Sequence, residues 1–366
     1  MRNYLKTLAL GATLISASAM MAQPGGGFGG GFPGGGFGGG FGGFGGFQQQ
    51  QPSIETSQEW KDVNYAGDDG QVYHMCDIYL PKAEKEKYPV VVHIYGSAWG
   101  SNSSKGAADI GTIVKALLDA GYAVVCPNHR SIGDAKWPAQ VNDIKAVIRF
   151  IRANAAKYKF DTSFIATSGF SSGGHLSAVT ALSNGVKVAK QGKAEYDIEG
   201  KVGPYTKESS AVNAFCDWSG PTELLQMECG NAMVFGGKGN TPEEQLIGLP
   251  KEGNEDNFVL LSATGFLDKN DVPGYMFHGD QDMVVASCVS QYLYDQMQKI
   301  GVPCTPRPRR IGSRTGSTTM PTGTRTRRLV PARPTRTVRT VSLTSGTRPS
   351  SASTARRTTA SVPHRA

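Results

Sequence analysis

The sequence predicts an α/β protein with a mostly parallel sheet and helices on both faces. Between about residues 55 and 304, short apolar runs alternate with longer segments of helical periodicity. The apolar runs are continuous and rich in β-branched residues, which is typical of strands buried on both faces. Repeated strand–helix units of this kind form parallel sheets that are covered by helices on both sides.

The residues before this region are expected to lie outside the fold. Residues 1–22 combine two basic residues, an apolar run and small residues, which is the pattern of a secretory signal peptide. The apolar run is shorter than the ~20 residues that a membrane span requires, so we expect a periplasmic or extracellular protein without a transmembrane segment. Residues 23–54 are rich in Gly, Phe and Gln. They are expected to form a disordered linker, because ordering Gly-rich backbone loses much entropy.

The first half of the folded region, taken as residues 55–304, contains three candidate strands and two candidate helices. The clearest helix is 138–156, because its apolar residues recur at spacings of three and four and form one apolar face. A second helix is expected to end at Gly121, a residue suited to a helix C-terminus. The expected strands are 72–80, 88–95 and 122–127, and the expected helices are 107–120 and 138–156.

The second half continues the alternation but contains two interruptions. Strands are expected at 164–168, 212–217 and 273–277, and helices at 172–183 and 286–300. Residues 186–210 and 223–256 are polar or Gly-rich and break the pattern. Insertions of this length often form a cap over an active site, and ordinary surface loops are the alternative.

The net charge of +8 is distributed unevenly along the chain. Residues 1–304 hold 24 Lys and Arg against 30 Asp and Glu, which sums to −6. Residues 305–366 hold 14 Arg and no acidic residue, which sums to +14. The basic balance therefore belongs to the last segment, and it does not indicate nucleic acid as a partner of the folded part.

Six cysteines occur in the chain, at positions 76, 126, 216, 229, 288 and 304. Their spacing matches no metal site, so no metal ligand is assigned. Export would permit disulfides, but cysteine pairing does not follow from sequence.

Ser171 lies in a G-x-S-x-G pentapeptide, GFSSG, within the stretch GFSSGGH. A candidate strand precedes it and a candidate helix follows it, which is the context of a nucleophile elbow. Gly169 and Gly173 flank the serine, because the sharp turn leaves no room for side chains there. A bare Gly- and Ser-rich turn is the alternative. The flanking elements favour Ser171 as a nucleophile, with Ser172 as a weaker rival.

Two further stretches complete a candidate acyl-transfer site. Residues 93–100, HIYGSAWG, follow a buried strand and form a loop of small residues whose backbone N–H groups could hold an oxyanion. Residues 275–285, YMFHGDQDMVV, end a late strand and carry Asp282, with Asp280 as a rival. A carboxylate in this place can orient a catalytic histidine. An ordinary loop and a surface turn are the respective alternatives.

These stretches together resemble the α/β-hydrolase esterases, particularly the bacterial feruloyl and acetyl-xylan esterase group. The match runs in order over about residues 70–304 and includes DIYLP, YAVVCPNHR, GFSSGGHL, DWSGPTEL and YMFHGDQDMVV. The resemblance implies an α/β-hydrolase fold with a small cap insertion, Ser171 as nucleophile and Asp282 as acid. It places the oxyanion hole at Gly96, Ser97 and Ser172, and it implies no metal and no cofactor.

The chain departs from the usual pattern of this group at two places near the serine. Where the group usually has HGGxW, this chain has Tyr95 and then Gly96, Ser97, Ala98 and Trp99. Backbone donors survive these changes, although Ser97 adds a hydroxyl and restricts φ. Ser172 stands where the group more often has Ala.

The largest departure is the catalytic base. In the group, the histidine follows the acid by some thirty residues, after one more strand, but residues 305–366 contain no Lys, Asp, Glu, Phe, Trp or Tyr. The basic residues are 20 Lys and 4 Arg before this point, and 0 Lys and 14 Arg after it. We expect a reading-frame shift near residue 305, with the histidine lost after residue 304. A genuine disordered Arg/Thr/Ser/Pro-rich tail is the alternative.

No other histidine is expected to serve as the base. The five histidines before Asp282 are assigned to structural roles, and His364 lies 82 residues beyond the acid in the Arg-rich segment. The expected function is therefore hydrolysis of a small-molecule or glycan ester through an acyl-enzyme, impaired in the chain as written. The substrate implied by the resemblance is an acetyl or feruloyl ester of plant cell-wall glycan. A serine peptidase of the same fold and a non-catalytic glycan-binding relative remain alternatives.

Overall fold

A computed structural model of the chain describes residues 54–106, 109–230, 236–237 and 239–305. The expected signal peptide (1–22) lies outside these residues. So do all but the last residue of the expected linker and all but the first residue of the Arg-rich segment. Within the described ranges, no helix is both long and apolar enough to cross a bilayer.

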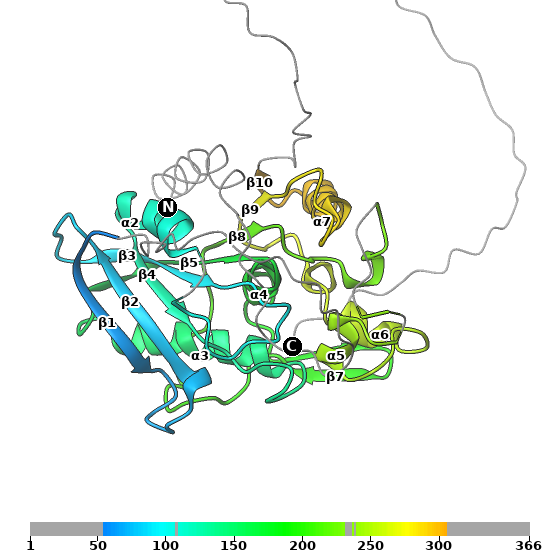
Figure 1. Cartoon of the computed structure of the whole chain (residues 1–366), viewed down its shortest axis with the longest axis horizontal. Coiled ribbons are helices and arrows are strands. Elements are labelled where there is room, and N and C mark those ends of the chain that lie inside the picture. The colour runs from blue at the N-terminus through cyan, green and yellow to red at the C-terminus, as the bar shows by residue number, and fades with distance from the viewer. Residues whose placement is uncertain (1–53, 107–108, 231–235, 238, 306–366) are drawn as a thin grey trace, which may run out of the picture. The chain divides into compact units, whose positions relative to one another are not determined.

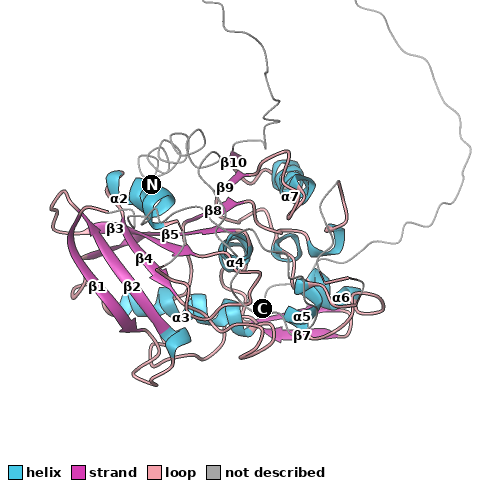
Figure 2. Cartoon of the chain, in the orientation of Figure 1, coloured by secondary structure: helices cyan, strands magenta, loops and turns pink. Residues whose placement is uncertain are grey.

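One eight-stranded sheet forms the centre of the fold, in the order β1-β2-β4-β3-β5-β8-β9-β10 (Figures 1 and 2). β1 pairs with β2, and β2 with β4, in antiparallel fashion, and the remaining neighbours are parallel. The predicted mostly parallel α/β sheet is confirmed. The strands are β1 Thr56–Asn64, β2 Met75–Pro81, β3 Tyr88–Ile94, β4 Ala123–Pro127, β5 Phe160–Phe170, β8 Ala214–Trp218, β9 Gly274–Phe277 and β10 Cys304–Thr305.

Helices connect the parallel strands. The clearest predicted helix is present as α3 Ala139–Ala153, and the helix after the candidate nucleophile is α4 Ser172–Leu182. Predicted helix 107–120 is in part a π-helix, Ile110–Val114, which continues into α2 Lys115–Asp119. The remaining helices are α5 Pro242–Ile247, α6 Glu255–Val259 and α7 Ser287–Ile300, with short 3₁₀ turns at Val72–His74, Leu224–Gln226 and Ala263–Phe266.

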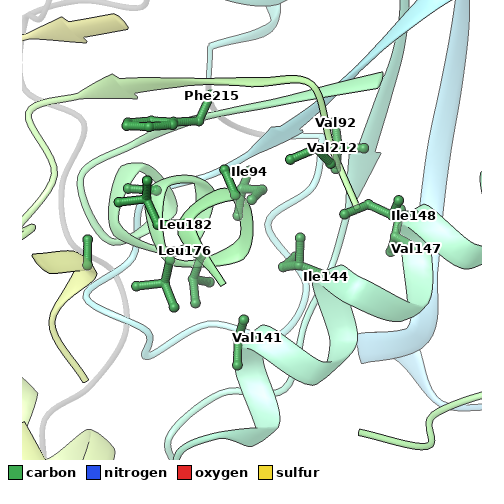
Figure 3. Close-up of a cluster of buried hydrophobic side chains, with 14 of the residues drawn as sticks. Val92, Ile94, Val141, Ile144, Val147, Ile148, Leu176, Leu182, Val212 and Phe215 are labelled. Atoms are coloured by element: carbon green, nitrogen blue, oxygen red, sulfur yellow. The ribbon is translucent and has the colours of Figure 1, made fainter. Parts of the chain in front are cut away.

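Two apolar clusters cover the two faces of the sheet. On one face, Val92 and Ile94 of β3 pack with Ile144 of α3 and Leu176 of α4 (Figure 3). On the other face, Val91 of the same strand packs with residues of α2. All seven residues of β3 are buried, which explains why its sequence, YPVVVHI, is continuously apolar apart from one histidine.

Some elements differ from the prediction. Residues Val72–His74 form a 3₁₀ turn, and the strand begins only at Met75, so the predicted strand 72–80 was three residues too long at its start. Strand β1 was not predicted at all. Its burial pattern is mostly exposed, so it lacks the apolar run that marks the central strands.

The first predicted insertion contains a two-stranded antiparallel hairpin, β6 Val188–Gln191 and β7 Ala194–Asp197. Glu199, just beyond the hairpin, fastens it to α3. Its carboxylate contacts Arg149 Nη1 at 2.5 Å and Lys145 Nζ at 3.3 Å, and both cations are buried. The hairpin also contacts α6, because Tyr196 donates its hydroxyl to Asn257 Oδ1 at 2.7 Å.

The second predicted insertion is joined covalently to helix α7. A disulfide links Cys229 in this insertion to Cys288 in the first turn of α7, across 59 residues of sequence. The other four cysteines are buried free thiols. The insertion is thus tied to the helix that follows Asp282. A role of either insertion as a cap stays a prediction.

Candidate active site

Ser171 lies at the junction of the central strand β5 and helix α4. Its backbone has φ 54° and ψ −124°, a conformation that L-residues rarely adopt. Its N–H donates to the carbonyl of Trp218 at 2.8 Å, and its own carbonyl accepts the N–H of His175 at 3.1 Å. The turn is therefore strained and fixed at both sides. It places Ser171 at the N-terminus of α4, where the helix dipole favours negative charge.

The glycines flanking Ser171 are required by close backbone contacts. A Cβ placed on Gly169 would lie 2.2 Å from the carbonyl oxygen of Gly173. A Cβ on Gly173 would lie 2.1 Å from the carbonyl oxygen of Ile94 in β3. Neither position has room for a side chain, in agreement with the steric argument made from the sequence.

The loop after β3 approaches the serine closely. A Cβ on Gly96 would lie 2.8 Å from the Cβ of Ser171 and 2.7 Å from the carbonyl oxygen of Phe170. The structure therefore brings Gly96 and Ser97 to the same place as Ser171 and Ser172, as the predicted oxyanion hole requires.

The N–H of Ser97, one of the predicted oxyanion donors, already has an acceptor. It donates to the Oγ of Ser172 at 2.9 Å. The next two residues, Ala98 and Trp99, have φ values of 48° and 56°. Ser97 itself does not have a positive φ, so its backbone accommodates a side chain, and the Ser172 hydroxyl takes a position that an alanine would leave open.

Asp282 lies in the loop after β9, at the same sheet edge as Ser171. Its Oδ1 accepts the N–H groups of Val284 at 2.8 Å and Val285 at 3.0 Å. Its Oδ2 lies 3.6 Å from Nε2 of His278, and the side chain is about one-fifth exposed, at 21%. One carboxylate oxygen thus holds the loop, while the second is available to a further donor.

Each described histidine is buried and has partners other than Ser171. His175 donates Nε2–H to the carbonyl of Leu261 at 2.7 Å and stacks edge-on against Trp99. Burial lowers the pKa of His175 to about 4, so the ring is neutral. The other four described histidines also have partners: His74 contacts Asp69, His93 contacts Ser168, His129 contacts the carbonyl of Arg130, and His278 contacts Ser290. His364 lies outside the described residues.

One buried carboxylate was not predicted. Asp217, the fourth residue of β8, is fully buried, and its Oδ1 accepts the N–H of Gly220 at 2.8 Å. Burial raises the pKa of Asp217 to about 7. The sequence signal was an acidic residue at the end of an apolar strand, in DWSGPTEL, but that stretch served only to support the resemblance.

The sequence matches the BD-FAE family over residues 76–297, which is more than half of the chain. The chain belongs to the BD-FAE family. The matched range contains Gly96, Ser97, Ser171, Ser172 and Asp282.

Solved structures similar to this BD-FAE protein include two with closely related sequences. A bifunctional GH43-CE protein of Bacteroides eggerthii is 46% identical, with a TM-score of 0.63, over 68% of this chain and 35% of that one. A truncated carbohydrate esterase from gut microbiota is 44% identical, with a TM-score of 0.64, over 68% of this chain and 86% of that one. The esterase 2 of Thermogutta terrifontis, 21% identical with a TM-score of 0.51, shares the fold. The predicted α/β-hydrolase fold is confirmed.

The curated relatives are also matched over only part of their length. Esterase LipQ of Mycobacterium tuberculosis is 25% identical over 209 residues, which is 57% of this chain and 45% of LipQ. Esterase LipC of the same organism is 33% identical over 123 residues, which is 33% of this chain and 29% of LipC. The chain spans about half the length of curated relatives such as LipM and LipQ of M. tuberculosis.

Proposed function

We propose that this BD-FAE protein is a serine esterase that hydrolyses carboxylic esters through an acyl-enzyme. The observation that carries the proposal is the contact between Gly96 and Ser171 at a strained elbow. The positive φ of Ser171 and the 2.8 Å approach to the position of a Gly96 Cβ bring a hydroxyl and a loop of backbone N–H groups together. A nucleophile and oxyanion donors in one place are what acyl transfer needs.

In this mechanism, the Ser171 Oγ attacks the ester carbonyl and the alcohol leaves. The N–H of Ser172, and that of Ser97 once it leaves the Ser172 hydroxyl, hold the oxyanion. Asp282 Oδ2 orients the imidazole that takes the proton. Water then releases the acid from Ser171. The similarity to a carbohydrate esterase and to a bifunctional GH43-CE protein supports a glycan ester as substrate. Acetyl and feruloyl esters of plant cell-wall glycan are the proposed substrates, and the proposed location is outside the cytoplasm.

The base is the part of this mechanism that the described residues do not supply. Each described histidine is engaged elsewhere, and the predicted frame shift concerns residues outside the described ranges. β10 nevertheless begins at Cys304 and pairs in parallel with β9, as expected of the strand that precedes the histidine. We therefore propose that the chain as written has low activity and that a frame-restored chain is fully active. Sequencing the locus tests the frame shift directly.

The test is labelling of Ser171 by a serine-directed phosphonate, followed by mass spectrometry of the peptide. We expect the frame-restored protein to label at Ser171, its Ser171→Ala variant not to label, and its Ser172→Ala variant to label. Turnover of a small acetyl ester should be lost in the Ser171→Ala variant and be much lower in the chain as written. Failure of a folded, frame-restored protein to label overturns the proposal. Turnover of peptides in place of esters would favour a peptidase.

A further inference from the structure

A row of buried polar groups lies behind Asp282 and has no part in the proposed mechanism. Asp217 is at the end of β8, Ser290 is in the first turns of α7, and His278 follows β9. Asp217 and Ser290 are fully buried, and His278 is 4% exposed. Three separate elements thus contribute one polar side chain each to the interior, beside the loop that carries Asp282.

The partners of His278 determine where its proton lies. Its Nε2 is 2.8 Å from the carbonyl oxygen of Val285, which can only accept a hydrogen bond, so Nε2 carries the proton. Burial lowers the pKa of His278 and outweighs the opposing charge of Asp282, whose Oδ2 lies 3.6 Å from Nε2, so the ring is neutral. A neutral ring protonated at Nε2 has a lone pair at Nδ1. Nδ1 lies 2.7 Å from Ser290 Oγ, so the serine hydroxyl donates to it.

The proton of Ser290 then determines the state of Asp217. A hydroxyl has one proton, and that of Ser290 is already given to His278. Ser290 Oγ also lies 3.4 Å from Asp217 Oδ2, so a Ser290 hydroxyl that donates to His278 can form a hydrogen bond here only by accepting one from Asp217. The other oxygen, Oδ1, accepts from Gly220, which leaves Oδ2 as the protonated atom.

The surroundings of Asp217 agree with a neutral carboxyl group. Cys216, its neighbour on β8, is a buried thiol whose pKa burial raises, so it is uncharged. From α4, the backbone at Gly174 approaches Asp217 Oδ1. The other side chains of the row that face Asp217, Ser290 of α7 and His278 of the loop after β9, are neutral. Among the described residues, no lysine or arginine forms an ion pair with Asp217.

The row ends at the residue that holds Asp282. Val285 accepts from His278 through its carbonyl and donates its N–H to Asp282 Oδ1 at 3.0 Å. The position of the Asp282 carboxylate is therefore coupled through Val285 to the imidazole of His278, and through it to α7 and β8.

We propose that Asp217, Ser290 and His278 are positioning residues that fix the Asp282 loop through an uncharged, one-directional hydrogen-bond chain whose first donor is a protonated Asp217. In this chain, Asp217 donates a hydrogen bond to Ser290, Ser290 donates to His278, and His278 donates to the carbonyl of Val285. The role of Asp282 as triad acid rests on the proposed function, while the order of protons in the chain does not.

The first test reads the proton on His278 in the unaltered full-length chain. In ¹⁵N-histidine NMR spectra, with His278 assigned from the His278→Gln variant, we expect a neutral ring protonated at Nε2. This state should persist from pH 6 to pH 8, although a free imidazole titrates near 6.5. A ring protonated at Nδ1, or one charged at pH 7, overturns the proposal.

The second test uses Asp217→Asn, because an amide can accept from Gly220 and donate to Ser290 as a protonated carboxyl does. Wild type should lose the stability that Asp217 contributes as pH rises from about 4 to 7, because the folded pKa of Asp217 lies above the ordinary value of 3.8. The Asn variant should not. Its melting temperature should therefore be near that of wild type at pH 4 and above it at pH 8. A variant that is destabilised equally at both pH values contradicts a protonated Asp217.

The third test asks whether the chain holds the loop. Ser290→Ala should raise amide hydrogen exchange at Val284 and Val285 by about tenfold and shift the His278 signals. Ser183→Ala removes another fully buried hydroxyl, at the C-terminal end of α4, and is the control, which should change neither. Unchanged exchange at Val284 and Val285 in the Ser290→Ala variant refutes the positioning role. These measurements need no turnover. The positioning role can therefore be refuted while Ser171 labels normally, and it can be confirmed while Ser171 fails to label.

Discussion

The N–H of Ser97 donates to the hydroxyl of Ser172 at 2.9 Å, so two residues of the predicted oxyanion hole are bonded to each other. A substrate oxyanion must therefore displace the hydroxyl before it can use the Ser97 N–H. An ordinary hydrogen bond contributes about 1 kcal/mol, and that is the approximate penalty we assign to this displacement.

Ser172→Ala should therefore accelerate the reaction of Ser171. Without the competing hydroxyl, the Ser97 N–H is open to the oxyanion, and about 1 kcal/mol corresponds to about a fivefold gain in rate. The measurement is the rate constant for phosphonate labelling in the frame-restored protein. Ser177→Ala is the control, because it removes a buried hydroxyl from the same helix that bonds to Cys216 instead. Slower labelling of the Ser172→Ala variant would mean that the hydroxyl assists the oxyanion.

Gly173→Ala should prevent stable folding. The new Cβ would lie 2.1 Å from the carbonyl oxygen of Ile94 and 2.6 Å from that of Tyr95, and both are backbone atoms that cannot move aside. We expect a loss of about 3 kcal/mol or more in the free energy of unfolding, measured by urea denaturation. At Gly133, the nearest atom to a Cβ is 3.5 Å away, so Gly133→Ala should be nearly neutral. Similar losses in both variants would show that the contact at Ile94 does not restrict this position.

Reduction of the Cys229–Cys288 disulfide should lower the free energy of unfolding by about 3 kcal/mol, because a long chain segment gains freedom in the unfolded state. Urea midpoints with and without reductant measure the change. The Cys229→Ser, Cys288→Ser double variant should resemble the reduced protein and should not respond to reductant, since the remaining cysteines are buried free thiols. Equal midpoints for oxidised and reduced wild type would contradict this expectation.

The buried ring of His175 should make the protein less stable in acid. Its folded pKa of about 4 lies below the ordinary 6.5, so the unfolded chain binds a proton that the folded chain rejects. The stability that the neutral His175 ring contributes is therefore lost as pH falls from about 6.5 toward 4. His175→Met removes this titration, so its deficit in melting temperature relative to wild type should shrink from pH 7 to pH 4. A deficit that stays constant over this range would exclude His175 as a source of acid sensitivity.

Apolar runs and glycines carried most of the information that the sequence held about the fold. The central strands β3, β4 and β5 are buried on both faces, so their β-branched runs identified them. β1 is largely exposed and was missed. The hairpin β6–β7 was missed because it is held by polar contacts, such as those of Glu199 with Lys145 and Arg149, that join residues far apart in sequence.

The candidate site could be predicted where the chemistry depends on local sequence. Gly169, Ser171 and Gly173 form one turn, and their spacing is sufficient to identify it. The bond between Ser97 and Ser172 joins two loops 75 positions apart, and nothing in the sequence indicated it. The raised pKa of Asp217 results from its burial against Gly220 and Ser290, and burial follows only from the completed fold.

The close approach of Gly96 to Ser171 also restricts how this protein can be redesigned. The loop that would border a bound acyl group has no clearance from the elbow at residue 96, so any bulkier side chain there forces the elbow to shift. A library meant to alter acyl-group preference should keep position 96 fixed and vary Ser97 and Ala98, whose side chains are partly exposed.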